Sequence, residues 1–131
     1  MLIFITGNGN ISFNHFMSEY VPKINACIND EFIIGDFRGT DVLTMEYLKD
    51  KTEKVTILHQ FDSPRYLPDS FKTKVSKWKK VGMFENDSKR DEYAINECDY
   101  IIGSDFNSDE KRESGTLKNI KKAIQLNKKH L

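Results

Sequence analysis

The sequence predicts an α/β protein with a Rossmann-like, three-layer α/β/α fold around a mostly parallel sheet of four to five strands. Short apolar runs rich in β-branched and aromatic residues recur along the chain, and most are followed by glycine and polar residues before a helical pattern begins. This alternation favours parallel pairing, because right-handed βαβ units return each connecting helix onto the sheet. The chain has 131 residues, the size of one domain, so we expect residues 1–131 to fold as a single unit.

The bulk composition restricts the possible partners. Twenty basic and twenty acidic residues give a formal net charge of zero, so no global field attracts nucleic acid or an anionic membrane, and any anion site must be local. The sequence has neither the opening pattern of a signal peptide nor an apolar run of about 18 residues, so we expect a cytoplasmic protein without a membrane partner. Cys27 and Cys98 lie in predicted helices without a C-x-x-C motif, which favours buried, reduced thiols.

The first predicted strand, residues 2–5, leads directly into the glycine turn at residues 6–10. A buried strand, a glycine-rich turn and a helix together present free backbone N–H groups and a positive dipole end to an anion, for which the phosphate of a nucleotide is the obvious candidate. The same residues are also typical of an ordinary tight turn, since Gly and Asn both tolerate positive φ.

Residues 11–28 have apolar side chains at spacings of three and four, which predicts a helix. Ser12 can cap this helix at its start. Pro22 lies in its middle and implies a kink or a break into two pieces.

A second strand is predicted at residues 32–34, followed by the polar loop 35–41. Thr40 or Asp41 can cap the next helix, which we expect to start near Val42. The loop therefore repeats the design of the first strand and turn.

A third strand is predicted at residues 55–59. The alternation of strands and helices is then interrupted at residues 61–82, which we interpret as a long loop containing a short helix. Lysines surround Trp78 in this segment. They suit either the binding of phosphate and bases or a solvated lysine face with one anchoring tryptophan.

The last part of the chain predicts a helix at residues 85–99, a strand at 100–103, a polar loop at 104–113 and a closing helix that begins at 114–116. The buried stripe expected for the closing helix is Leu117, Ile120, Ala123, Ile124 and Leu126.

Three glycine-containing turns are predicted to meet at one edge of the sheet, at residues 7–9, 39–40 and 115–116. In open α/β sheets, ligands bind beyond the carboxyl ends of the strands, where the winding direction reverses. Three sets of backbone donors around one crevice favour an anionic ligand.

Several motifs carry a resemblance to a known family. In chain order they are Gly-x-Gly at residues 7–9, Gly35-Asp36-x-x-Gly39-Thr40-Asp41, Lys89-Arg90-Asp91, Cys98-Asp99-Tyr100-Ile101-Ile102-Gly103 and Ser114-Gly115-Thr116. This order looks like the SLOG superfamily, which includes the LOG phosphoribohydrolases and the Rossmann-like domain of the DNA-processing protein Smf/DprA. The nucleoside deoxyribosyltransferases and deoxynucleotide N-hydrolases are similar in outline.

The resemblance implies one Rossmann-like nucleotide-binding domain with the phosphate at the first and last glycine turns. It also implies that Arg90 contributes its planar fork to the ligand, whereas without the resemblance a surface ion pair with Asp87 or Glu92 is the preferred explanation of this residue. The expected ligand-binding residues are Gly7, Asn8, Gly9, Asn10, Gly35, Asp36, Arg38, Gly39, Thr40, Asp41, Arg90, Ser114, Gly115 and Thr116.

One departure from the family pattern bears on catalysis. The hydrolytic members have a glutamate after the Gly-Thr turn, whereas here Thr116 is followed by Leu117, Lys118 and Asn119. If the protein is an enzyme, another acid must act at the sugar. The catalytic candidates are Asp36, Asp41 and Asp91, with Asp87, Glu110 and Glu113 also within reach; each has an alternative role as a helix cap or solvated loop acid.

We therefore expect a protein that binds a nucleotide or nucleotide-derived small molecule, as a sensor, carrier or sequestering module. An N-glycosidase or 2-deoxyribosyltransferase acting on nucleoside 5′-monophosphates is the first alternative, and a nucleic-acid-binding domain that uses the lysines of residues 72–80 is the second. No metal or cofactor is expected. The resemblance and the exposed aromatic residues expected in segment 61–78 both predict a homodimer or larger homo-oligomer.

Overall fold

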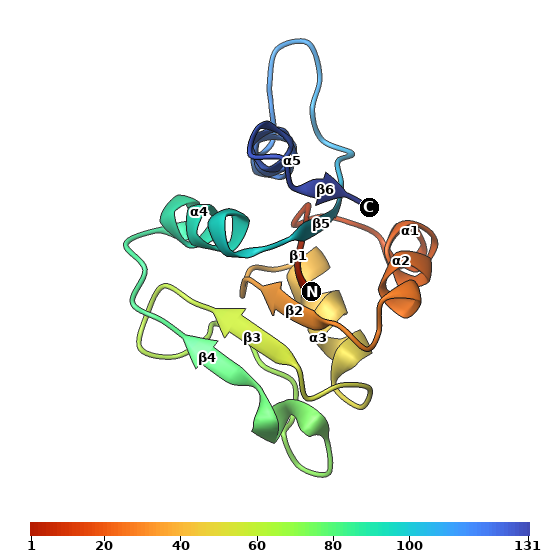
Figure 1. The fold of residues 1–131 in the computed structure, drawn as a ribbon, viewed down its shortest axis with the longest axis vertical. Coiled ribbons are helices and arrows are strands. Elements are labelled where there is room, and N and C mark those ends of the chain that lie inside the picture. The colour runs from red at the N-terminus through yellow and green to blue at the C-terminus, as the bar shows by residue number, and fades with distance from the viewer.

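A computed structural model describes residues 1–131 and has three layers, with helices on both faces of a six-stranded sheet (Figure 1). All strand pairs are parallel, in the order β4-β3-β2-β1-β5-β6. The strands are β1 (Leu2–Gly7), β2 (Glu31–Ile34), β3 (Val55–Leu58), β4 (Lys79–Val81), β5 (Tyr100–Ser104) and β6 (Lys129–His130). The predicted fold class and parallel pairing are confirmed.

The sheet has one strand more than the upper limit of the predicted four to five. The two strands missed by the sequence are β4 and β6, which lie at the edges and contain three and two residues. Their residues are exposed and mostly basic, so no apolar run marks them. Short, lysine-bearing strands are typical of sheet edges, because they discourage pairing with another chain.

Side chains of the central strands alternate between two cores, because successive residues of a strand point to opposite faces. Ile3 and Ile5 of β1 belong to the larger core, under α1 (Phe13–Glu19), α2 (Val21–Ala26) and α3 (Thr40–Leu48). Phe4 belongs to the smaller core, under α4 (Asp87–Glu97) and α5 (Gly115–Gln125). The central strands are thus buried on both faces, as their unbroken apolar runs predict.

The predicted helix of residues 11–28 breaks into α1 and α2 at Tyr20. Ser12 caps α1 by accepting a hydrogen bond from the His15 N–H (3.1 Å), and Pro22 lies in the first turn of α2, where its missing N–H has no cost. The buried Tyr20 hydroxyl donates to the Thr6 carbonyl (2.8 Å) and accepts from the Ser104 N–H (2.9 Å). The helix break therefore supports the ends of β1 and β5.

The start of α3 differs from the prediction. Neither Thr40 nor Asp41 caps the helix; α3 begins at Thr40, and Gly39 is the cap with a φ of 76°. Both side chains are engaged elsewhere: the Thr40 hydroxyl donates to the Asn8 carbonyl (3.0 Å), and an Asp41 oxygen accepts from the Phe37 N–H (3.0 Å). Both side chains hold the β2–α3 loop against the turn after β1.

The irregular segment at residues 61–82 contains a short 3₁₀ helix, η1 (Lys74–Lys77), and the unpredicted strand β4. Trp78 is buried in the larger core, and its indole N–H donates to the Thr52 carbonyl (2.9 Å). The anchoring-tryptophan interpretation is therefore confirmed, and Phe61 and Phe71 are the exposed aromatics of the segment.

The predicted buried stripe of α5 is wrong at two positions, since Ile124 is 52% exposed and Leu126 is 44% exposed. Ile120 and Ala123 face the sheet, and Ile124 is rotated about 100° from Ala123 around the helix. Leu126 is the residue at which the helix ends.

Both cysteines are free thiols, Cys98 buried and Cys27 only partly buried, and burial raises the pKa of each. None of the helices combines the length and the apolar character that crossing a bilayer requires.

Candidate functional site

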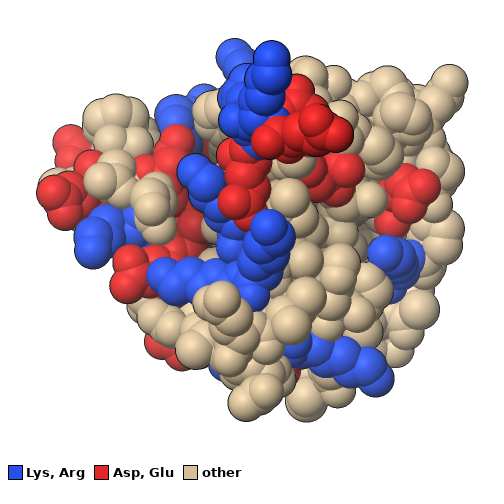
Figure 2. Space-filling view, turned by 90° about the horizontal axis from the view of Figure 1, so that it is seen from above, with Lys and Arg blue, Asp and Glu red and all other residues tan.

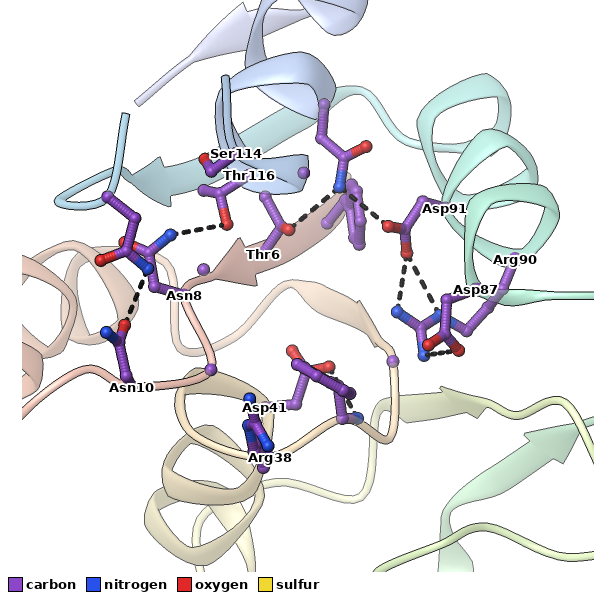
Figure 3. A pocket seen from close by; sticks show the side chains of 18 of the residues that line it. Thr6, Asn8, Asn10, Arg38, Asp41, Asp87, Arg90, Asp91, Ser114 and Thr116 are labelled. Atoms are coloured by element: carbon purple, nitrogen blue, oxygen red, sulfur yellow. Dashed lines mark hydrogen bonds and ion pairs between the residues drawn. The ribbon is translucent and has the colours of Figure 1, made fainter. Parts of the chain in front are cut away.

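A pocket of about 530 Å³ lies at the carboxyl ends of β1, β2 and β5 (Figure 3). It is lined by the loops that follow these strands and by the first turns of α4 and α5. All but three of the predicted ligand-binding residues line it, the exceptions being Asp36, Gly39 and Thr40. The volume lies within the range of small-molecule sites.

The glycines of the β1 and β2 turns allow these loops to touch one another. A Cβ atom on Gly7 would collide with the Thr40 hydroxyl, and one on Gly9 would lie 2.7 Å from Cε2 of Phe37. A Cβ atom on Gly35 would lie 2.6 Å from Cζ of Arg90. Close approach is therefore the reason for these glycines, whereas Gly39 alone among the glycines requires a positive φ.

The β1 turn is tied to the start of α5 through Asp105, a residue that the sequence did not single out. Asn8 donates to the Asp105 carboxylate (3.0 Å), and the Ser114 hydroxyl donates to the same oxygen (2.6 Å). Partial burial opposes ionisation of Asp105, but hydrogen bonds from Ser108, Ser114 and Asn8 outweigh it and hold the pKa of Asp105 well below its usual value. Asp105 is therefore a charged anchor beneath two of the predicted phosphate-binding turns.

The first turn of α5 leaves backbone donors free. Ser114 caps the helix by accepting from the Leu117 N–H (3.1 Å), while the N–H groups of Gly115 and Thr116 have no partner within the protein. A Cβ atom on Gly115 would meet no atom within 4 Å, in contrast to the glycines of the other two turns. The space beside Gly115 is therefore open to a ligand.

Arg90 lies at the α4 side of the pocket and is almost fully engaged by carboxylates (Figure 3). Its guanidinium contacts Asp36 (3.1 Å), Asp87 (3.0 Å) and Asp91 (2.9 Å). The expectation of a surface ion pair is met only in part, because Arg90 is buried and pairs with Asp87 but not with Glu92. This geometry suits a residue that holds carboxylates in place more than one that grips a phosphate.

Asp36 lies behind the pocket and is 1% exposed. The Arg65 guanidinium lies 2.7 Å from one oxygen of the Asp36 carboxylate, and the backbone N–H of Arg65 donates to the other oxygen (2.8 Å). Burial alone would raise the pKa of Asp36, but these hydrogen bonds and the charges of Arg65 and Arg90 outweigh it and lower the pKa. As a catalytic candidate, Asp36 is placed away from the space where a ligand fits.

Asp41 and Asp91, the other two catalytic candidates, both line the pocket. Burial raises the pKa of Asp41 to about 7, although the charge of Arg90 and the Phe37 N–H oppose the shift. Asp91 accepts a hydrogen bond from the side-chain amide of Asn119 (3.0 Å), which also donates to the Thr6 hydroxyl (3.2 Å). Asn119 thus orients an acid that is 28 residues earlier in the chain.

Two arginines line the pocket without forming an ion pair, Arg38 from the β2–α3 loop and Arg112 from the β5–α5 loop. Arg112 lies in an irregular polar loop, so no periodic pattern could have indicated it. None of the lysines of residues 72–80 lines the pocket. Figure 2 shows basic and acidic side chains intermixed over the charged part of one face, so that face carries no uniformly basic patch. The other lining residues that the sequence did not predict as ligand-binding are Phe4, Thr6, Phe37, Asp87, Asp91, Asn107 and Asn119.

No group of three or more His, Cys, Asp or Glu side chains is arranged to hold a metal ion. The arrangement can instead offer backbone N–H groups and two free guanidinium groups to an anion, beside carboxylates that accept hydrogen bonds. Comparison with models of protein families, with curated proteins and with solved structures finds no match, so no family is assigned to the chain.

Proposed function

We propose that the protein binds a nucleotide or nucleotide-derived small molecule in this pocket, as a sensor, carrier or sequestering module. The phosphate lies at the first turn of α5 and the turn after β1. The rest of the ligand extends over the end of β1 toward Asp41 and Asp91, whose carboxyl groups accept hydrogen bonds from hydroxyl or amino groups.

The observation that carries this proposal is the open first turn of α5. Gly115 and Thr116 have unpaired N–H groups, Gly115 has free space on its side-chain face, and both residues line the pocket. An anion at a helix N-terminus gains from the helix dipole as well as from the N–H groups. Arg38 and Arg112 supply two positive charges that no carboxylate of the protein neutralises.

A thermal-shift screen tests the proposal, with ribonucleotides, deoxynucleotides, NAD derivatives and cyclic dinucleotides as ligands. A ligand at one hundred times its Kd should stabilise the folded protein by about 2.7 kcal/mol, and mass spectrometry should recover it intact. Absence of a shift with every nucleotide class would refute the proposal.

Arg112 and its neighbour Lys111 provide a matched pair of variants for this screen. Both residues are exposed in the same loop, but only Arg112 lines the pocket. We expect Arg112→Gln to weaken binding of the stabilising nucleotide about tenfold, the loss of roughly one charge-assisted contact, and Lys111→Gln to leave it within about twofold. Equal losses in the two variants would show that the effect is one of general charge.

A second candidate function is supported by Asp41. A carboxyl group with a pKa of about 7 inside a polar pocket suits general acid or base catalysis, and Asp91 lies in the same pocket. This would make the protein an N-glycosidase or 2-deoxyribosyltransferase acting on nucleoside 5′-monophosphates. Release of free base during the screen, or exchange of the base when a second free base is supplied, would establish it if Asp41→Asn or Asp91→Asn abolished the reaction; intact ligand after long incubation with and without a second free base would refute it.

A further inference from the structure

The pocket wall is almost entirely polar, with Phe4 and Phe37 as its only apolar side chains. Phe4 is 2% exposed and packs in the core under α4 and α5. Phe37 is only partly buried and is not part of either core cluster. It is therefore the one aromatic ring that can offer an apolar surface to a ligand.

Phe37 has one contact that restrains its backbone and one that restrains its ring. Its backbone N–H donates to Asp41 (3.0 Å) at the first turn of α3. Its Cε2 atom packs so closely on the β1 turn that a Cβ atom on Gly9 would lie 2.7 Å away. A ring fixed in this way loses little freedom when a ligand binds, so it suits recognition.

Two guanidinium groups lie against this ring, but they differ in how they are held. Cζ of Arg65 is 5.6 Å from the ring centroid, and Arg65 is tied to Asp36 and Asp87 by ion pairs of 2.7 Å. Cζ of Arg38 is 5.2 Å from the centroid, and Arg38 is exposed and has no ion-pair partner. A cation–π contact at an exposed site is weak, so an entering phosphate can draw Arg38 off the ring.

We propose that Phe37 forms a subsite for the planar base of a nucleotide, with Arg38 moving from the ring to the phosphate when the ligand enters. This inference rests on the proposed function, which it extends from phosphate recognition to selection for an aromatic base. Stacking tolerates any base, because every base has a π face, so the subsite selects nucleotides over sugar phosphates and does not distinguish one base from another.

Isothermal titration calorimetry on the full chain tests the subsite. The probes are the four ribonucleoside and four deoxyribonucleoside 5′-monophosphates, compared with ribose 5-phosphate and 2-deoxyribose 5-phosphate. We expect the tightest nucleotide to bind at least tenfold more tightly than its sugar phosphate. Phe37→Leu should reduce this ratio to threefold or less while leaving the sugar-phosphate affinity within about twofold.

Two further variants separate stacking from support of the loop. Phe37→Tyr keeps the ring and should keep the ratio. Phe106→Leu, which removes an exposed ring that stacks on His15 outside the pocket, should also keep it. As a direct readout, the fluorescence of 2-aminopurine riboside 5′-monophosphate should be quenched on binding to the wild-type and Phe37→Tyr proteins and much less on binding to the Phe37→Leu protein.

Each other outcome overturns the inference. Equal affinity for nucleotides and sugar phosphates, a Phe37→Leu protein that keeps the ratio, or one that loses both affinities equally would remove the base subsite and leave phosphate binding intact. Loss of the ratio in Phe37→Tyr as well would show that Phe37 only supports the loop. Failure of all eight monophosphates overturns the inference, whereas failure of nucleotides of every class overturns the proposed function too.

Discussion

Asp41 gives the most direct test of the pocket electrostatics, because its pKa should make the stability of the protein depend on pH. The residue is 7% exposed, and burial raises its pKa to about 7, against about 3.9 for an aspartate in an unfolded chain. The folded state therefore keeps the proton between these two values while the unfolded state loses it. Asp41 contributes stability that is fully present below pH 4 and is lost as the pH rises toward 7.

The magnitude follows from the width of this window. Each pH unit within it changes the free energy of unfolding by about 1.4 kcal/mol, so the wild-type protein should lose about 3 kcal/mol through Asp41 between pH 5 and pH 8. Asp41→Asn cannot ionise, and its amide oxygen can still accept the Phe37 N–H that Asp41 binds. The variant should therefore gain about 2 to 3 kcal/mol relative to the wild type on going from pH 5 to pH 8.

Urea unfolding at pH 5 and pH 8 measures this difference directly. The matched control is Asp62→Asn, which makes the same change at an exposed residue with no ion pair. We expect the stability of the control relative to the wild type to be the same at both pH values, within about 0.5 kcal/mol. If Asp41→Asn behaves like the control, Asp41 ionises normally in the folded protein, and the account of a desolvated carboxyl group in the pocket is wrong.

Two other substitutions test the packing of the site. Gly115→Ala should fold as well as the wild type or slightly better, because its methyl group meets no protein atom and alanine favours helices over glycine by up to about 1 kcal/mol. The same variant should weaken nucleotide binding about tenfold, because the methyl group fills the space beside the free N–H groups. Thermal denaturation measures the stability and calorimetry the affinity, and an unchanged affinity would contradict the role of that space. Asp36→Asn should destabilise the protein by about 3 kcal/mol in urea at pH 7, at the low end for a broken buried ion pair, because other carboxylates still pair with Arg90 and Arg65. The loss should shrink as the pH falls through the lowered pKa of Asp36, and a loss below about 1 kcal/mol at pH 7 would show that the pair contributes little.

The fold was predictable from the sequence where burial leaves a strong pattern. The four inner strands, β1, β2, β3 and β5, are apolar runs, and each is buried on both faces. The edge strands have no such pattern, because one side of each is free and its residues face water. Their pairing depends on neighbours brought up by the rest of the chain, which a local pattern does not record.

The location of the pocket was predictable for a topological reason, and its internal contacts were not. Parallel strands deliver their following loops to one edge, so the glycine turns had to meet there. The partners of Arg90 depend on how close α4 packs to Gly35, and Asp105 reaches Asn8 across 97 residues of sequence. Contacts of this range have no spacing rule, so neither the Arg90–Asp36 pair nor the Asp105 anchor could be inferred, whereas the pairing of Arg90 with Asp87 on the same helix was among the expected alternatives.

A chain without net charge can still present a polarised pocket, because its charges are paired unequally. Asp87 and Asp91 line one side and are held by Arg90, whereas Arg38 and Arg112 line the pocket without a carboxylate partner. Charges that pair with each other largely cancel at distance, so the charges left without an ion-pair partner matter most: the guanidinium groups of Arg38 and Arg112, and the Asp105 carboxylate that Asn8 and Ser114 hold beneath the turns. We therefore propose that the nucleotide of the proposed function enters with its anionic end toward the two arginines and the free N–H groups of α5, and with its hydrogen-bond donors toward Asp91.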